Sequence, residues 1–366
     1  DGDANYDVLG KSVSLSNDGS IVAMGVTGAG TGNDLDAGEV KVYSYNSSNN
    51  SWDQMGSDIV GETFYDESGH SVSLSGDGLR VAIGAIYNDD GGNGSGHVRV
   101  YDYSNNSWSQ VGGDIDGEDT ADESGYSVSL SNDGSRIAIG AKDNDGNGTY
   151  SGHVRVYDLS NNSWSQLGDD IDGESAYDRS GYSVSLSSDG SILAVGAPFN
   201  AGGPPAYGHV RVYEWDITAN NGNGAWDQLG GDIDGETGTF GEAGKSVSLS
   251  SDGSIVAIGA NENSAGGIER GHVRVYKYKI PTSSEWSITT DDNTGYVIKD
   301  GDTTPTTNKK YWVKIGNDAQ LEGSNNNDYF GTSVSLSDNG LKIAIGAPQD
   351  GTGQSDKGYV KVYELS

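Results

Sequence analysis

The chain of 366 residues contains no cysteine, which excludes disulfides, zinc–thiolate sites and cysteine nucleophiles. Basic residues are scarce: 21 Lys and Arg stand against 54 Asp and Glu, for a formal net charge of −33. A surface this acidic repels nucleic acid and anionic membranes, so we expect neither as a partner. No apolar run reaches about 18 residues, which argues against insertion into a membrane.

Helical patterns are also missing. No stretch of about a dozen residues repeats its apolar positions every 3.6 residues, as an amphipathic helix would. Only 33% of the residues are hydrophobic, and they gather in short alternating runs between the 58 glycines. The run SVSLS at 127–131 has the two-residue period of a β-strand with one apolar face. The sequence therefore predicts an all-β fold.

One sequence block occurs six times, with its first glycine near residues 10, 69, 125, 181, 244 and 331. A typical copy contains four strand-length runs: SVSLS, a second such as RIAIGA, a third such as HVRVYDL, and a fourth that carries a Trp. A turn with Asp-Gly joins the first two runs in most copies, because glycine tolerates the positive φ of a tight hairpin. Four antiparallel strands per repeat of about 40–60 residues are typical of a propeller blade.

We therefore expect a single β-propeller domain over residues 1–366 with six four-stranded blades, or seven blades if a repeat is missing. The predicted repeats cover about 1–56, 57–112, 113–168, 169–230, 231–316 (with an insert at about 280–310) and 317–366. The last copy ends at Ser366 after its third strand, so the last blade is expected to lack its fourth strand. Either the sequence is trimmed from a longer native chain that supplies the closing strand, or a neighbouring molecule donates the strand to the open edge.

The final copy reads FGTSVSL from Phe330 and IGAP from Ile345, and the fourth copy keeps GAP from Gly196. This pattern resembles the FG-GAP repeat of integrin α-subunit propellers and related bacterial and algal surface proteins. The resemblance covers essentially the whole chain and implies a β-propeller, but it leaves the ligand open, since such a fold serves adhesion receptors, lectin-like proteins and scaffolds. The family's calcium loop, of the type Asp-x-Asp-x-Asp-Gly, joins the first and second strands. Here that connection is mostly Asn-Asp-Gly or Ser-Asp-Gly, too short to wrap a cation, so the family's calcium site does not carry over.

A second group of acids lies between the predicted blades, where alternating carboxylates offer the oxygen ligands that calcium prefers. The candidate metal ligands are Asp114, Asp116, Glu118, Asp122, Asp170, Asp172, Glu174 and Asp178. Calcium is thus the one candidate cofactor. The alternative is a solvated turn in which one acid pairs with the Arg of the third strand, at Arg99, Arg155, Arg211 or Arg274.

Four of the five histidines occupy one repeat position, which predicts a structural role between blades: His97, His153, His209 and His272. Six Asn residues begin an N-x-S/T triplet in predicted loops: Asn46, Asn49, Asn93, Asn105, Asn147 and Asn161. These are candidate N-glycosylation sites and favour a secreted or cell-surface protein.

No Gly-x-Ser-x-Gly elbow is present, and the acids follow the repeat rather than breaking it, so we expect no catalysis. The predicted function is a non-catalytic extracellular structural or adhesive module, a subunit of a surface assembly or filament. Its expected partners are further copies of itself, other surface proteins or glycans. The alternative is a carbohydrate- or protein-binding receptor head that uses loops on one propeller face.

Overall fold

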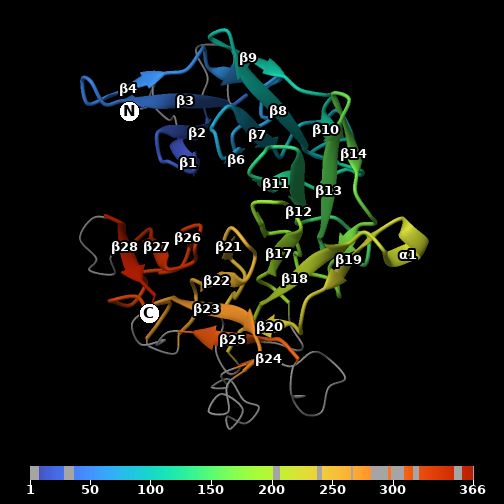
Figure 1. Ribbon diagram of the computed structural model, residues 1–366, viewed down its shortest axis with the longest axis vertical. Helices are drawn as coiled ribbons and strands as arrows, with labels where there is room; N and C mark the ends of the chain where they lie inside the picture. The colour runs from blue at the N-terminus through green and yellow to red at the C-terminus, as the bar shows by residue number, and fades with distance from the viewer. Residues whose placement is uncertain are drawn as a thin grey trace. The chain divides into compact units, whose positions relative to one another are not determined.

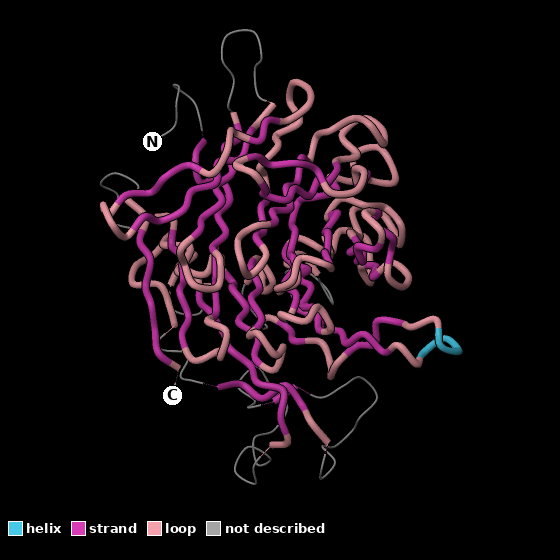
Figure 2. The backbone as a smooth tube through the Cα atoms, turned by 45° about the horizontal axis from the view of Figure 1, so that its top comes forward, coloured by secondary structure: helices cyan, strands magenta, loops and turns pink. Residues whose placement is uncertain are grey.

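The computed structural model describes residues 8–28, 37–200, 207–236, 241–264, 267–281, 296–297, 309–315, 321–349 and 357–365. The fold is an all-β, six-bladed β-propeller, as the sequence predicts. Figure 2 shows strands joined by loops, and among the described residues the only helical segment is the single turn α1 (Ala219–Gly222). The chain divides into two compact units, 1–172 and 173–366.

The first unit holds blades 1 to 3, each with four antiparallel strands and a two-residue fifth strand that pairs with the third. In chain order (Figure 1) the strands are β1 (Val8–Leu15), β2 (Ile21–Thr27), β3 (Glu39–Asn46), β4 (Ser51–Gln54), β5 (Ile59–Val60), β6 (Ser71–Leu74), β7 (Arg80–Ala85), β8 (His97–Ser104), β9 (Ser107–Gln110), β10 (Ile115–Asp116), β11 (Ser124–Leu130), β12 (Arg136–Ala141), β13 (His153–Ser160), β14 (Ser163–Gln166) and β15 (Ile171–Asp172).

The second unit holds blades 4 to 6, of which the last has only three strands, as predicted. Its strands are β16 (Ser183–Leu186), β17 (Ile192–Ala197), β18 (His209–Asp216), β19 (Ala225–Gln228), β20 (Ile233–Asp234), β21 (Ser246–Leu249), β22 (Ile255–Ala260), β23 (His272–Lys279), β24 (Tyr296–Val297), β25 (Tyr311–Ile315), β26 (Ser333–Leu336), β27 (Lys342–Ala347) and β28 (Tyr359–Glu364). The predicted insert at 280–310 falls mostly outside the described residues; its strand β24 pairs with β25.

The turn between the first two strands of a blade is closed by its own side chains. In blade 2, the Ser75 hydroxyl donates a hydrogen bond to Asp77 (2.7 Å), and the backbone N–H of Leu79 donates to the same carboxylate oxygen (2.9 Å). A carboxylate used in this way fixes a tight turn locally. The family's calcium loop has no counterpart at this turn, in agreement with the sequence.

The apolar core lies between consecutive blades. Val40 and Val42 on the third strand of blade 1 pack against Val72 and Leu74 on the first strand of blade 2. We call the sheet face that carries Val40 and Val42, or their equivalents in another blade, the trailing face of that blade. The sheet face that carries Val72 and Leu74, or their equivalents, is the leading face. Both follow from the two-residue period, which places alternate side chains on one side of the strand. A blade between two others therefore uses two apolar faces, one for each neighbour.

Candidate functional site

The acid-rich segment after the fourth strand does not form one compact loop. Its short strand β10 pairs back onto β8 of its own blade, with Ile115 opposite Val98 and Asp116 opposite His97. Beyond β10 the chain enters blade 3. As a result, the predicted ligand Asp114 lies beside His97 of blade 2, whereas Glu118, four residues later, lies beside His153 of blade 3. The structure thus distributes one acidic turn over two sites.

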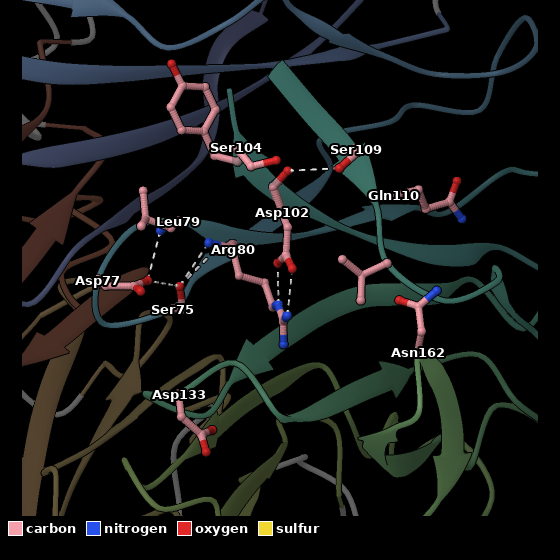
Figure 3. A pocket seen from close by; sticks show the side chains of 12 residues that line it. Ser75, Asp77, Leu79, Arg80, Asp102, Ser104, Ser109, Gln110, Asp133 and Asn162 are labelled. Carbon is pink, nitrogen blue, oxygen red and sulfur yellow. Dashed lines mark hydrogen bonds and ion pairs between the residues drawn. The ribbon is translucent and has the colours of Figure 1, made fainter. Parts of the chain in front are cut away.

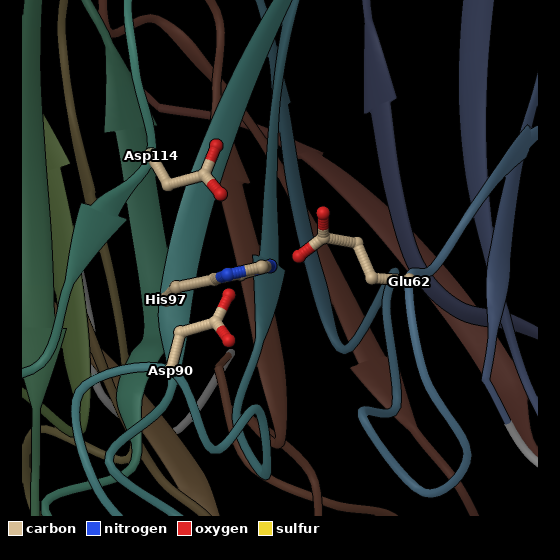
Figure 4. Close-up of side chains that lie close together, drawn as sticks. All are labelled: Glu62, Asp90, His97 and Asp114. Atoms are coloured by element: carbon tan, nitrogen blue, oxygen red, sulfur yellow. The ribbon is translucent and has the colours of Figure 1, made fainter.

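In blade 2, four potential metal ligands come together (Figure 4). Glu62 follows β5, Asp90 lies in the loop between β7 and β8, His97 begins β8, and Asp114 precedes β10. One donor atom from each residue lies within 4.8 Å of a donor atom of every other. We call this group the blade 2 cluster. The imidazole lies between the carboxylates of Asp90 and Asp114 and points toward Glu62.

Arg99, on the third strand of blade 2, joins the same group. Its guanidinium forms an ion pair with Glu62 and longer hydrogen bonds of 3.2 and 3.4 Å with the two carboxylate oxygens of Asp114. The amide of Gln110 also donates to Asp114. The pairing of an inter-blade acid with the Arg of the third strand, which the sequence left as an alternative, is therefore present here.

His97 is the buried member of the blade 2 cluster. It is 3% exposed, and its Nδ1 atom has no hydrogen-bond partner. Burial lowers the pKa of His97 from its ordinary value of 6.5, while the nearby carboxylates of Asp114 and Asp66 act in the opposite direction. The ring is accordingly uncharged at neutral pH, which is the form that binds metal ions.

Related clusters of three residues occur at the same repeat position in the next two blades. They are Glu118, His153 and Asp170 in blade 3, and Glu174, His209 and Asp232 in blade 4. Each includes an arginine ion pair: Arg155 lies 3.2 Å from Glu118, and Arg211 lies 3.7 Å from Glu174. The place of Asp90 is taken in blade 3 by Gly146, so this cluster has no fourth donor at that position.

The remaining predicted ligands have other surroundings. Asp122 and Asp178 are each 2% exposed and accept hydrogen bonds from a backbone N–H and from the amide of a following loop asparagine. Burial raises the pKa of both carboxyls. Asp116 and Asp172, on β10 and β15, are exposed. Sequence reasoning missed Asp90, which lies in a Gly- and Asn-rich loop without a motif, and assigned His97 a structural role.

A polar groove of about 410 Å³ opens elsewhere in the first unit (Figure 3). Arg80 and Asp102 form a bidentate ion pair at its centre, with nitrogen–oxygen distances of 2.5 and 2.8 Å. Hydroxyls, amides and carboxylates line most of the rest, including Ser109, Gln110 and Asn162. Such a lining offers both hydrogen-bond donors and acceptors to a small polar molecule.

Two blade faces carry exposed apolar side chains. On the leading face of blade 1, Val13 and Leu15 are 64% and 59% exposed, whereas the corresponding residues of blade 2 are buried. On the trailing face of blade 6, Val360 and Val362 are each 69% exposed. The corresponding trailing-face residues in blades 1, 2 and 5 are almost fully buried: Val40, Val42, Val98, Val100, Val273 and Val275.

The six predicted glycosylation sites all lie at described positions. Asn49, Asn93, Asn105, Asn147 and Asn161 are exposed. Asn46 is half-buried, and its side-chain amide donates a hydrogen bond to Asp53. Glycosylation at these sites stays a prediction. No helix among the described residues is long and apolar enough to cross a membrane.

The FG-GAP repeat model matches residues 62–101 and 322–363. The chain therefore carries FG-GAP repeats, and the resemblance seen in its sequence is confirmed. No curated protein matches the chain.

Solved structures with a similar fold include three from bacteria. They are a 6-phosphogluconolactonase candidate from Bacteroides uniformis (11% identity, TM-score 0.57, covering 97% of this chain and 80% of that one), the periplasmic gluconolactonase PpgL of Pseudomonas aeruginosa (14% identity, TM-score 0.50, covering 100% and 87%), and a 6-phosphogluconolactonase candidate from Bacteroides fragilis (12% identity, TM-score 0.51, covering 97% and 87%).

These neighbours correct one expectation. The sequence led us to expect that the protein is not an enzyme, but the propellers similar to it include gluconolactonases. The expectation relied on the acids following the repeat, and Asp90 breaks that repeat symmetry in blade 2. At such low identity the likeness concerns the fold alone and assigns no reaction to this chain.

Proposed function

We propose that this protein is an extracellular structural and adhesive module that associates with further copies of itself through the leading face of blade 1 and the trailing face of blade 6. The single observation that carries the proposal is the exposure of Val13, Leu15, Val360 and Val362. Exposed apolar patches on an otherwise acidic surface mark sites of protein association.

The partner on each exposed face is a second copy of this chain, because a leading face and a trailing face are complementary. Within the first unit, a leading face is covered by a trailing face, as Val72 and Leu74 are covered by Val40 and Val42. The chain has one exposed face of each kind, on blade 1 and on blade 6. A leading face of one copy therefore fits the trailing face of another, and contact of this head-to-tail type builds chains or rings of molecules.

The open edge of blade 6 adds a second kind of contact. In the described part of the chain, β28 pairs only with β27, whereas the corresponding strand β8 of blade 2 pairs with β7 on one side and β9 on the other. The unpaired edge of β28 thus offers backbone donors and acceptors to an incoming strand.

The expected strength of association is moderate. Full burial of a fully exposed Val or Leu side chain contributes about 1.5–3 kcal/mol. The four residues are 59–69% exposed, so together they contribute about 4–8 kcal/mol. Association itself costs about 4–15 kcal/mol in lost freedom. We therefore expect assembly to depend on protein concentration over an accessible range.

An extracellular location is supported by the N-x-S/T triplets, because five of their six asparagines are exposed. The test is the mass of protein isolated from its natural source before and after treatment with an N-glycosidase. A loss of mass supports the location, and an unchanged mass that equals the mass of the unmodified chain argues against it.

Assembly is tested by light scattering during size-exclusion chromatography over a range of concentrations. We expect the wild type to exceed the monomer mass as concentration rises, and the variants Leu15→Lys and Val362→Lys to stay monomeric. Ile217→Lys is the matched control, because Ile217 is 70% exposed but belongs to neither face. A monomeric wild type at all concentrations contradicts the proposal.

Mixing the variants tests the head-to-tail arrangement. Leu15→Lys retains the trailing face and Val362→Lys retains the leading face, so an equimolar mixture is expected to form dimers that neither variant forms alone. A symmetric contact between two identical faces predicts instead that Leu15→Lys or Val362→Lys alone still dimerises. The mixture therefore distinguishes the two arrangements.

A second candidate function is the binding of a small polyhydroxylated ligand, such as a sugar or sugar lactone, in the polar groove beside Arg80 and Asp102. It is favoured by the lining of hydroxyls, amides and carboxylates, which matches the hydroxyl groups of such a ligand. Saturation-transfer NMR with a panel of sugars, together with a gluconolactone hydrolysis assay, tests it. Loss of signal in Asn162→Ala, with its fold retained, supports the groove, and no signal for any compound argues against it.

A further inference from the structure

We propose that Glu62, Asp90, His97 and Asp114 form a binding site for a divalent transition-metal ion of the Zn²⁺ type. The site is independent of the proposed assembly, because none of its residues belongs to the leading face of blade 1 or the trailing face of blade 6.

The first argument is geometric. Four donor atoms from four separate segments converge within 4.8 Å of one another. A Zn²⁺ ion bound at about 2.0–2.2 Å from each donor in a tetrahedron needs neighbouring donors about 3.3–3.6 Å apart. The side chains of Glu62 and Asp114 are 39% and 27% exposed, so both have room for the adjustment of about 1 Å that closure requires.

The second argument is the unpartnered nitrogen of His97. The residue is 3% exposed, and Nδ1 is buried without a hydrogen-bond partner. Burying a polar atom without a partner costs free energy, so such atoms call for an explanation. The imidazole points into the group of carboxylates (Figure 4), where a metal ion supplies the missing partner.

The third argument is charge. Three carboxylates and the single guanidinium of Arg99 leave two negative charges in excess, which equals the charge of a divalent cation. Arg99 pairs with Oε1 of Glu62 and leaves Oε2 of that carboxylate for a metal ion. Its hydrogen bonds of 3.2 and 3.4 Å to Asp114 exceed the about 2.7–2.9 Å of strong charge-assisted bonds, so Asp114 gives up one oxygen at little cost.

The donor set selects the class of metal. Calcium takes six to eight oxygen ligands, and the blade 2 cluster offers four donors, one of them an imidazole nitrogen. Imidazole with carboxylate in a four-donor set suits zinc and related transition ions. The calcium predicted from the sequence for the inter-blade turns is therefore not the ion proposed here.

The repeat provides a natural comparison. Glu118, His153 and Asp170 in blade 3 correspond to three of the four donors, whereas Gly146 stands in the place of Asp90. The local backbone is shared: the N–H of Asp90 donates to Asn88, and the N–H of Gly146 donates to Asn144 in the same way. A residue exchanged between the two positions therefore keeps its surroundings.

The experiment measures Zn²⁺ binding to protein freed of metal by a chelator, in competition with a chromogenic zinc indicator. We expect one equivalent per wild-type chain, a loss of affinity of at least about 10-fold in Asp90→Gly, and a gain of a second equivalent in Gly146→Asp. Gly146 has no positive φ, and a Cβ there meets Oδ1 of Asn144, which accepts the N–H of Gly146. Asp90 makes the same bond to Asn88, so the chain accommodates the change. Metal-free unfolding temperatures show whether either variant alters the fold.

A spectroscopic measurement identifies the ligands. Co²⁺ is added as a probe, and its visible absorption is expected to show tetrahedral coordination in the wild type and to disappear in His97→Gln. Asp170→Asn, in blade 3, is the control that leaves the spectrum unchanged. The proposal is overturned if the wild type binds no Zn²⁺, if Asp90→Gly binds it equally well, or if Ca²⁺ binds in preference to Zn²⁺.

Discussion

The hydroxyl of Ser71 in blade 2 donates a hydrogen bond of 2.7 Å to the backbone carbonyl of Gly125 in blade 3. The same bond occurs between blades 1 and 2 from Ser12 to Gly69 (2.8 Å). In the second unit it links Ser183 to Gly244 and Ser246 to Gly331, both at 2.8 Å. The first serine of the SVSLS run in one blade and the glycine two residues before that run in the next blade thus form a repeated inter-blade contact.

Replacing Ser71 tests the contribution of this bond. Ser71→Ala leaves the carbonyl of Gly125 buried without its partner, so we expect the free energy of unfolding to fall by about 1–3 kcal/mol. Urea denaturation measures the change. Ser109→Ala is the control: the Ser109 hydroxyl is exposed and its bond is 3.5 Å long, so the cost should stay below about 0.5 kcal/mol. Equal effects of the two substitutions contradict the assignment.

Gly84, on the second strand of blade 2, permits blades 2 and 3 to approach closely. The Cα of Gly84 lies so near blade 3 that an added Cβ would overlap the carbonyl oxygen of Gly125 and crowd the hydroxyl of Ser71. Because both obstacles lie in a packed interior, Gly84→Ala is expected to cost several kcal/mol and to separate blades 2 and 3. Differential scanning calorimetry should show a large drop in unfolding temperature.

Gly113→Ala is the matched control for that substitution. Nothing lies within 4 Å of a Cβ at Gly113, and its φ is not positive. Its unfolding temperature should therefore stay close to that of the wild type or rise slightly. If Gly84→Ala is tolerated equally well, the blades pack less closely than the distances indicate.

The repeat made the architecture predictable, because the alternation of Val and Leu with Ser identifies a strand from neighbouring residues alone. The role of the serines was not predictable in this way. The Ser71 hydroxyl bonds a residue 54 positions away. A two-residue period shows which side chains share a face of the strand, but it does not show which residue of another blade they contact. The alternation predicted only a polar face of the strand, whereas in the structure this face makes a hydrogen bond to the next blade.

The candidate metal site shows the limit more sharply. The acids of the inter-blade turn were recognised, but their assignment to one cation assumed that neighbours in sequence act together. Pairing of β10 with β8 places Asp114 in blade 2 and leaves Glu118 to blade 3. Asp90 belongs to a loop whose conformation depends on Asn88 and not on any strand pattern, so only three-dimensional structure reveals it as the fourth donor.

The tryptophan of the fourth strand joins blades by a hydrogen bond as well as by packing. Trp108 Nε1 donates to the carbonyl of Met55 in the preceding blade (2.7 Å), and Trp164 donates to Val111 in the same way (3.0 Å). Trp108→Phe keeps most of the apolar contact and removes the donor, so we expect a loss of about 1–2 kcal/mol in the free energy of unfolding. Trp52→Phe, at a 45% exposed position, should cost less. Chemical denaturation followed by circular dichroism measures both.

The buried histidine of blade 4 should make stability depend on pH. Burial, reinforced by the positive charge of Arg211, lowers the pKa of His209 to about 3 from its ordinary value of 6.5. Between these two values the unfolded chain binds a proton that the folded chain does not, so acidification favours unfolding. The stability associated with neutral His209 is complete above pH 6.5 and is lost progressively as the pH falls toward 3. His209 contributes at most about 1.4 kcal/mol per pH unit to the slope of the free energy of unfolding against pH.

The variant His209→Asn separates the contribution of His209 to the pH dependence of stability from those of other titrating groups. His153, whose pKa burial lowers to about 4, adds a slope of the same sign, whereas Asp178, whose pKa burial raises above 3.8, acts in the opposite direction. We therefore compare the two proteins between pH 6 and pH 5, after correcting for their difference at pH 8, where the imidazole is neutral in both the folded and the unfolded chain. The wild type should lose stability more steeply than His209→Asn by about 1 kcal/mol per pH unit. Parallel profiles would mean that His209 can gain its proton without unfolding, through local opening around Glu174 and Asp232.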